Sequence, residues 1–343
     1  MRFSGRPPRA AITRSAWPAR TRSSCRPSTG SHRRSTPMSL RLLPSATCAG
    51  RNCRSGTPSI PRKSSRSWRA ISTSTASRAM NKPPVKPNLS WSAFSRNCNM
   101  ERRLQHLNWL TVRDLVPEEI DTVILPVGTV EAHGSACLGT DNFIPEAIAN
   151  DIAERINALV APIVNYGITK SLIRYNGGST IQPDNFQRYI RDILDSMVDT
   201  GFHNIILMNG HGGNNSSLKP VAFEFHRERQ ANIAVIHWWE LCGRMTEEFF
   251  GHAGGHAGTD ETAMVMAVDP SLADQSRFSK DLAYSFKPGA DVYPVPGTIL
   301  LYKEDEGYPE FDVEQAKEYR KNVSATVGDF VESVLERWRK FGL

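Results

Sequence analysis

The chain has 343 residues, of which 39% are hydrophobic, enough to bury the core of one large domain or two average ones. Its net charge of +7 is unevenly distributed. Residues 1–99 contain 20 Lys or Arg and no Asp or Glu, whereas residues 100–343 hold the other 22 of the 42 basic side chains and all 35 acidic ones. The basic balance therefore gives no ground for expecting residues 100–343 to bind nucleic acid.

Residues 1–99 are rich in Ser, Arg and Pro and keep neither a strand nor a helix period, so we expect a disordered extension. Three interpretations remain open. Acid-free, Arg- and Ser-rich composition suits an organellar transit peptide, and a basic arm would bind nucleic acid through phosphates. We favour the third, in which the start is mis-called and translation begins at Met100, because so long a stretch without a carboxylate is unusual even for a disordered arm.

Only two of the six cysteines, Cys137 and Cys242, fall outside this extension. Two distant cysteines provide neither a disulfide framework nor a thiolate metal site, so we expect a reducing, cytoplasmic setting. No apolar stretch approaches the ~18–20 residues that cross a bilayer, and the N-terminus lacks the apolar region of a secretory signal. We therefore expect no membrane association.

From Met100 onward, short apolar runs alternate with segments of helical periodicity. The apolar, often β-branched runs predict four strands, at 122–128, 160–167, 203–210 and 232–239. Apolar residues at helical spacing predict helices at 143–159, 183–201, 216–229, 261–268 and 312–341. Strands that alternate with helices are typical of a parallel sheet covered on both faces. We predict one α/β domain over residues 100–343, a three-layer α/β/α sandwich with a mostly parallel sheet.

Polar residues follow three of the predicted strands, at the edge where a parallel sheet gathers its ligands. Behind the first strand come Glu131, His133 and Asp141. Behind the third comes His211, in the segment NGHGGNN. A glycine-containing loop after the fourth strand carries His252, His256, Asp260 and Glu261.

Each of these residues also has a purely structural interpretation. A histidine in a Gly-rich loop is more often a hydrogen-bonded turn residue than a ligand. Asp141 is well placed to cap the helix predicted near Phe143. The NGHGGNN segment resembles an anion-binding turn at a helix N-terminus, although it lacks the Lys and the Ser or Thr of a P-loop. What favours a metal site is that three separate connections deliver imidazoles and carboxylates to one edge of the sheet.

The spacing is compatible with two adjacent ions. In an extended segment residues i and i+2 face the same side, so Glu131 and His133 can reach one centre or two neighbouring ones. Asp141 can bridge two ions, and the remaining groups complete a mixed N/O set suited to Zn, Mn or Fe(II). Five ligands are too many for one catalytic zinc with an open position, so we predict two divalent ions about 3.5–4 Å apart.

At these residues the chain resembles the creatininase family of amidohydrolases. The resemblance rests on LPVGTVEAHGSACLGTDNFIPEAI (125–148), NGHGGN (209–214) and GHAGTDET (255–262), and it extends over roughly residues 108–275. It implies a flavodoxin-like α/β/α fold, two divalent ions and hydrolysis of a C–N bond in a cyclic or linear amide. It also implies a homo-oligomer, often a hexamer in this family.

The resemblance assigns five metal ligands, Glu131, His133, Asp141, His211 and Glu261. It assigns the catalytic role to His256, and we include Glu261 with it. The hypothesis is hydrolysis by a hydroxide that bridges the ions, with His256 stabilising the oxyanion or delivering a proton to the leaving nitrogen. Asp260 is the weaker candidate, with a role in orienting a ligand.

The chain departs from the creatinine-hydrolysing members at three positions. It has Gly212 and Gly213 where they carry Tyr and Glu, and His252 where they carry Trp. These changes weigh against creatinine and resemble family members that act as formamide deformylases or as a cofactor-precursor peptidase. We expect Gly212, Gly213, Trp238 and Trp239 to line the substrate pocket, with core packing as the alternative for at least one tryptophan. A non-catalytic phosphate- or nucleotide-binding module is the competing hypothesis from another class.

Overall fold

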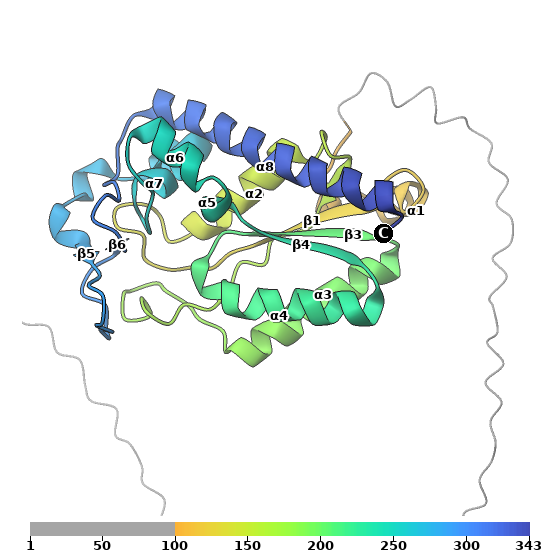
Figure 1. Ribbon diagram of the computed structural model, residues 1–343, viewed down its shortest axis with the longest axis horizontal. Coiled ribbons are helices and arrows are strands. Elements are labelled where there is room, and N and C mark those ends of the chain that lie inside the picture. Colours follow the sequence, from red (N-terminus) through yellow and green to blue (C-terminus); the bar gives the residue numbers. More distant parts are fainter. Residues whose placement is uncertain (1–99) are drawn as a thin grey trace, which may run out of the picture. The chain divides into compact units, whose positions relative to one another are not determined.

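The computed structural model describes residues 100–343, and the expectations for the basic extension lie outside these described residues. Four strands form one parallel sheet in the order β2-β1-β3-β4 (Figure 1). They are β1 (Thr122–Val127), β2 (Ala158–Val160), β3 (Asn204–Asn209) and β4 (Asn232–His237). The predicted α/β fold with a mostly parallel sheet is thereby confirmed.

Helices cover both faces of the sheet (Figure 1). One face carries α3 (Pro183–Thr200) and α4 (Asn215–Arg229). The other carries α2 (Thr140–Ile152), α5 (Trp238–Leu241), α6 (Gly243–Phe250), α7 (Thr259–Val268) and α8 (Val313–Phe341). A short helix α1 (Trp109–Leu115) precedes β1, and a small parallel pair, β5 (Ala283–Ser285) with β6 (Ile299–Leu301), lies at the edge where the main strands end.

The continuous apolar runs of the strands follow from this layering. Ile124 and Ile206 pack with the α2, α7 and α8 layer, whereas their chain neighbours Val123 and Ile205 pack with α3 and α4. Successive strand residues point to opposite faces, so a sheet covered on both sides needs apolar residues at every position. Within residues 100–343, no helix combines the length and the apolar character needed to cross a bilayer.

Three predicted boundaries were wrong. The second strand spans Ala158–Val160 rather than 160–167, because Pro162 cannot donate to the ladder and only Val164 still bridges to β1. The predicted helix at 143–159 begins at Thr140 and ends at Ile152. The fourth strand stops at His237, since the next residue already starts α5.

The helix α7 matters most for the site. It is buried along nearly its whole length and packs against α2 and α8. Gly258 is its N-cap residue, and its first turn contains Asp260 and Glu261. The fold therefore presents two carboxylates at the same edge of the sheet as the loops that follow β1 and β3.

Candidate metal centre

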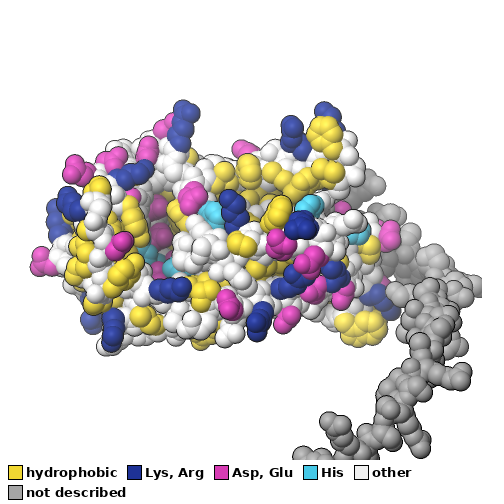
Figure 2. Space-filling view, turned by 60° about the horizontal axis from the view of Figure 1, so that its bottom comes forward, with side chains coloured by type: hydrophobic (Ala, Val, Ile, Leu, Met, Phe, Trp, Pro, Cys, Tyr) yellow, Lys and Arg dark blue, Asp and Glu magenta, His cyan; other side chains and the backbone are white. Residues whose placement is uncertain are grey.

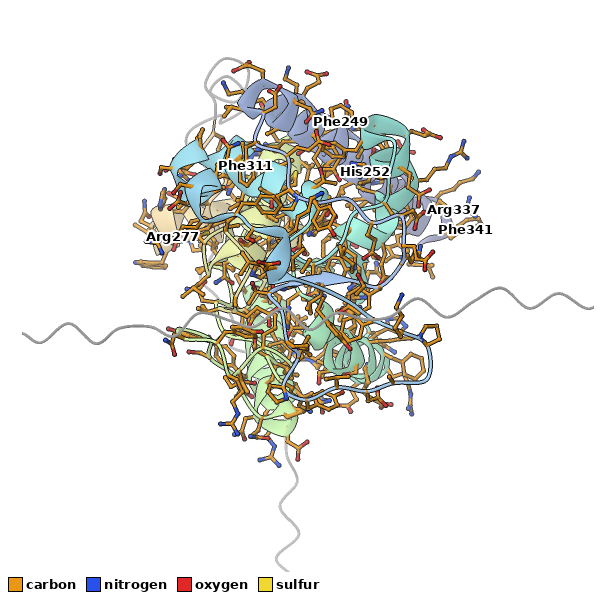
Figure 3. The ribbon with its side chains drawn as sticks, turned by 90° about the vertical axis from the view of Figure 1, so that its left-hand side faces the viewer. Phe249, His252, Arg277, Phe311, Arg337 and Phe341 are labelled. Atoms are coloured by element: carbon orange, nitrogen blue, oxygen red, sulfur yellow. The ribbon has the colours of Figure 1, made fainter. Side chains whose placement is uncertain are left out.

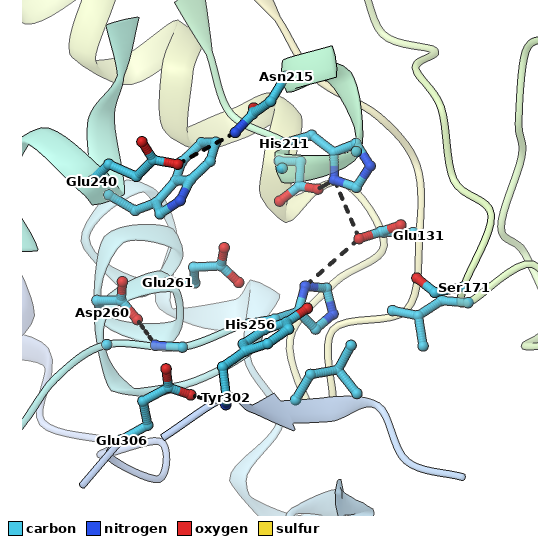
Figure 4. Close-up of a pocket in the computed structure, with 18 of the residues that line it drawn as sticks. Glu131, Ser171, His211, Asn215, Glu240, His256, Asp260, Glu261, Tyr302 and Glu306 are labelled. Carbon is cyan, nitrogen blue, oxygen red and sulfur yellow. Dashed lines mark hydrogen bonds and ion pairs between the residues drawn. The ribbon is translucent and has the colours of Figure 1, made fainter. Parts of the chain in front are cut away.

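The predicted ligands converge at the carboxyl ends of the strands, in a hollow where acidic and histidine side chains gather (Figure 2). The pocket has a volume of about 900 Å³, and Glu131, Asp141, His211 and Glu261 line it. Figure 4 shows Glu131, His211 and Glu261 around this space. His133 is fully buried against the same groups. Residues more than a hundred positions apart thus meet at one place, as the sequence predicted.

The donor atoms fall into three triplets, and two of them share one carboxylate. Glu131, Asp141 and His211 form the first of these two, and His133, Asp141 and Glu261 form the second, each with its atoms within 4.8 Å of one another. The third triplet consists of Glu131, His133 and His256. Asp141 Oδ2 lies 2.8 Å from His211 Nδ1, and Asp141 Oδ1 lies 2.9 Å from His133 Nε2. Each oxygen of this carboxylate therefore faces a different triplet, the arrangement that a bridging ligand requires.

Backbone carbonyls set the tautomers of both histidines. His133 Nδ1–H donates to the carbonyl of Glu131 at 3.1 Å, and His211 Nε2–H donates to the carbonyl of Ile168 at 3.0 Å. A carbonyl only accepts, so the proton of a neutral ring belongs on those nitrogens. The opposite nitrogens then turn their lone pairs towards the carboxylates, which is how metal-binding histidines are oriented.

With both rings neutral in these tautomers, three buried atoms at this centre have no hydrogen-bond partner within residues 100–343. They are Glu131 Oε2, His133 Nε2 and Asp141 Oδ2. Buried polar atoms are nearly always paired, because leaving one unpaired costs about 1–3 kcal/mol. Carboxylates and lone pairs that face one another need positive charge between them. The mixed N/O donor set fits a divalent ion of the Zn, Mn or Fe(II) type.

The pKa values of the two histidines report the same electrostatic field. Burial lowers the pKa of His133, but Asp141 and Glu261 outweigh it and raise the value to about 10. Burial likewise opposes the rise at His211, where Glu131 and Asp141 bring the pKa to about 9. Without a cation the site would hold protons on these rings, and a divalent ion would displace them.

The pKa values of the three carboxylates shift in different directions. Burial raises the pKa of Glu131 and raises that of Glu261 well above its usual value. At Asp141 burial has the same tendency, but the two adjacent histidines outweigh it and lower the pKa. Asp141 lies in the first turn of α2, where Gly139 is the N-cap residue, and its carboxylate faces the histidines. Asp141 is therefore not the N-cap residue of α2, the structural alternative considered for it.

His256 belongs to the third triplet, with Glu131 and His133. Its Nε2–H donates to the carbonyl of Ala132 at 2.9 Å, and its Nδ1 lies 3.6 Å from Glu131 Oε1 (Figure 4). Burial, together with the neighbouring His133, lowers the pKa of His256 to about 3. The ring is therefore neutral in this structure, and Nδ1 is the nitrogen left for chemistry in the pocket.

The asparagines of NGHGGNN, which sequence reasoning did not single out, hold the His211 loop. Asn209 Nδ2 donates to the carbonyl of His211 at 2.9 Å, and Asn209 Oδ1 accepts the His211 N–H at 3.2 Å. Asn214 Oδ1 accepts the N–H of Ile168, the residue whose carbonyl orients the His211 ring. A Cβ on Gly213 would overlap both His211 Nε2 and the Ile168 carbonyl, so this hydrogen bond requires glycine.

Two further candidate residues, His252 and Asp260, lie outside the triplets. The ring of His252 stacks on Phe250, with centroids 5.9 Å apart, and lies beside α6 (Figure 3). Its Nε2 is 3.3 Å from Glu310 Oε1. Asp260 is buried, and its Oδ1 accepts the N–H of Gly255 at 3.0 Å. Burial raises the pKa of Asp260 to about 6.

The two tryptophans lie in different environments. Trp239 lines the pocket together with Gly212 and Gly213. Trp238 is fully buried in the core and is absent from the pocket lining within the described residues, so its assignment to substrate binding is corrected. Sequence reasoning missed further lining residues because long loops bring them in, and these include Lys170, Asn215, Glu240, Tyr302 and Glu306.

Comparison with known proteins agrees with this geometry. The family model described as creatinine amidohydrolase matches residues 105–325. The creatinine amidohydrolase of Pseudomonas putida is 29% identical over 224 residues, which cover 57% of this chain and 85% of that protein. The 3-dehydro-scyllo-inosose hydrolase of Thermotoga maritima is 32% identical over 171 residues, 46% of this chain and 53% of that protein.

The fold has counterparts among solved structures. A crystal structure of creatininase matches with a TM-score of 0.61 at 22% identity, over 68% of this chain and 97% of the other. Two further creatininase structures, a mutant of Zn–Zn type and a manganese form, each match with a TM-score of 0.59 at 23% identity, over 68% of this chain and 98% of theirs. At this identity the likeness shows a shared fold.

Proposed function

The chain belongs to the creatininase family, and we propose that it is a metal-dependent amidohydrolase that holds two divalent ions above its sheet. One ion would be held by Glu131, Asp141 and His211, and the other by His133, Asp141 and Glu261. The observation that carries the proposal is that the two oxygens of one buried carboxylate face two separate imidazole nitrogens. Zinc and manganese forms of similar structures support this choice of ions.

The reaction would be hydrolysis of a C–N bond in a small amide. Bound ions of this kind lower the pKa of a water molecule and polarise the substrate carbonyl. His256 would stabilise the oxyanion or deliver a proton to the leaving nitrogen. It would do so through Nδ1, because its other nitrogen already donates to Ala132, and such acid catalysis contributes typically ~10²–10⁴ in rate.

The substrate would lie between Trp239 and the two carboxylate–imidazole triplets. Gly212 has no side chain, and the space beside it extends to the Trp239 ring, 3.9 Å from a Cβ placed there. A larger side chain would fill this space. The open wall therefore suits a substrate other than creatinine, and a formamide or a small amide of a cofactor precursor remains the second candidate.

A phosphate-binding module is less compatible with the site. Three carboxylates, Glu131, Asp141 and Glu261, line the pocket beside the NGHGGNN loop. The lining holds four further acidic residues and two lysines, so acidic groups outnumber basic ones even with His133 and His211 protonated, and this excess would repel a phosphate group. A nucleotide-binding role would therefore itself depend on bound cations.

We also propose that residues 100–343 act as one domain in a cytoplasmic homo-oligomer, with a hexamer as the expected size. The support for the oligomer is resemblance to the family. Light scattering on the purified protein tests it, and a monomer at micromolar concentration would contradict it.

A substrate screen tests the proposed activity. The full chain, loaded with Zn or Mn, is assayed on creatinine, formamides and small lactams, with and without a chelator. We expect hydrolysis of at least one class that the chelator abolishes and added metal restores. Turnover that persists in the chelated protein would contradict the proposal.

A further inference from the structure

The loop that carries His256 is held on both sides of this residue by carboxylates from one helix turn. Gly255, which precedes His256, donates its N–H to Asp260 Oδ1 at 3.0 Å (Figure 4). Ala257, which follows it, donates its N–H to Glu261 Oε2 at 2.7 Å. Both carboxylates belong to the first turn of α7. The first turn of α7 thus fixes the backbone immediately before and immediately after the ring.

We propose that Asp260 is a positioning residue of the active site, which acts through His256 by fixing the backbone that carries it. The proposal rests on the hydrolytic role given above to His256. Asp260 belongs to none of the donor triplets found within residues 100–343, and it is only 4% exposed. Its carboxylate is directed at the loop backbone.

The neighbouring glycine indicates that this contact shapes the loop. A Cβ on Gly254 would overlap the carboxylate of Asp260. No left-handed backbone angle requires glycine at position 254. Glycine is therefore needed at position 254 for space, because the loop backbone passes directly over the Asp260 carboxylate.

The other contacts of His256 do not replace this one. Its carbonyl accepts the N–H of Leu300 at 2.9 Å, and its ring donates to Ala132. Glu306 lies on another side of Gly255, where it accepts the N–H of Tyr302. Among the described residues, Asp260 is the group that binds the N–H on the N-terminal side of His256.

Removing the carboxylate should release that side of the loop while leaving the donor triplets intact. Mislocating a catalytic group by about 1 Å can cost ~10²-fold in rate. We therefore expect Asp260→Ala to lower kcat by about this factor and to leave KM and metal content close to those of the wild type. Hydrogen exchange of the amides at 254–257 should accelerate at least about tenfold, because the Gly255 N–H loses its acceptor.

A double-mutant cycle with His256→Ala decides whether Asp260 acts through the histidine. If it does, Asp260→Ala lowers kcat in the wild-type background and has no further effect once His256 is absent. Asp269→Ala serves as the matched control, because this exposed aspartate also accepts a backbone N–H, at the other end of α7. It should change neither kcat nor exchange at 254–257.

Gly254→Ala gives an independent perturbation should Asp260→Ala fail to fold. The added methyl group forces the Asp260 carboxylate and the loop backbone apart. Gly254→Ala is then combined with His256→Ala in the same kind of double-mutant cycle. Additive losses in kcat, or unchanged exchange at 254–257 in a folded variant, would overturn the inference. Failure of the proposed function looks different, because the metal-loaded wild-type protein would then hydrolyse nothing while the exchange measurement still reports on the loop.

Discussion

The pocket and the outer face of α3 and α4 use acidic side chains in opposite ways. On the outer face Arg229 pairs with Asp195 and Asp199, and Arg191 pairs with Glu228, all partly exposed to solvent. In the pocket Glu131 and Asp141 are almost fully buried and face imidazole nitrogens. A solvated surface tolerates charge with or without a partner, whereas a buried site does not. Within residues 100–343 these buried acids have no arginine or lysine partner, which marks the pocket as the candidate cation site.

The largest effect should follow from changing the shared carboxylate. Asp141→Asn removes the charge that both triplets use, so we expect loss of both ions and a fall in kcat/KM of more than about 100-fold, since even groups that only support metal ligands are worth 10–100-fold. Metal analysis after dialysis provides the measurement. Asp151→Asn on the same helix, outside the pocket, is the control, and equal metal loss in both variants would contradict the assignment.

The two adjacent glycines of the His211 loop should differ from each other. Gly213→Ala would displace His211 from the Ile168 carbonyl, and we expect metal affinity to fall by roughly 10–100-fold. The methyl group of Gly212→Ala would meet Trp239 at an ordinary contact distance of 3.9 Å, and this variant should keep the ions bound. Titration with a metal-buffered indicator compares them. Equal affinities would mean that the His211 orientation does not govern binding.

The pH dependence of stability should differ between the metal-free and metal-loaded proteins. The pKa values of His133 and His211 are raised to about 10 and about 9, above the ~6.5 of an unfolded histidine. Their protonation therefore stabilises the chelated protein fully below pH ~6.5, and this stability is lost as the pH rises through 9–10. Bound ions need the deprotonated rings, so we expect the rise in Tm on metal loading to grow from pH 6.5 to pH 8.5. Parallel melting curves for the two forms would contradict this.

The smallest effect should come from the outer face. Arg229→Ala breaks exposed ion pairs with Asp195 and Asp199, and we expect Tm to change by no more than about 3 °C. Metal content and turnover should be unchanged. Calorimetry and the substrate assay check both. Loss of bound metal in this variant would show that the two regions are coupled.

The sequence predicted the layered fold because each layer leaves a local pattern. Continuous apolar runs such as 122–128 belong to strands buried on both faces, and amphipathic segments such as 183–201 belong to helices that cover them. The predicted element boundaries were wrong where a single residue overrides the hydrophobic pattern. Pro162 ends β2 early, and Trp238 turns from a strand position into the first residue of α5.

The donors were predictable because parallel strands end at a common edge, which places Asp141 and His211 together although they are far apart in sequence. The supporting contacts were not. The hydrogen bonds of Asn209 with His211 and of Asp260 with Gly255 join a side chain to the backbone, and only the folded loops bring these atoms within reach. Periodicity carries no information about such contacts. Periodicity also could not distinguish Trp238, which lies in the core, from Trp239, which lines the pocket.

The most direct test of the account is anomalous diffraction from crystals of the full chain grown with manganese. We predict two peaks, one on each side of Asp141, about 3.5–4 Å apart, with His211 at one and His133 at the other. A pocket that stays free of metal at saturating manganese, or ions bound away from Asp141, would contradict the central claim.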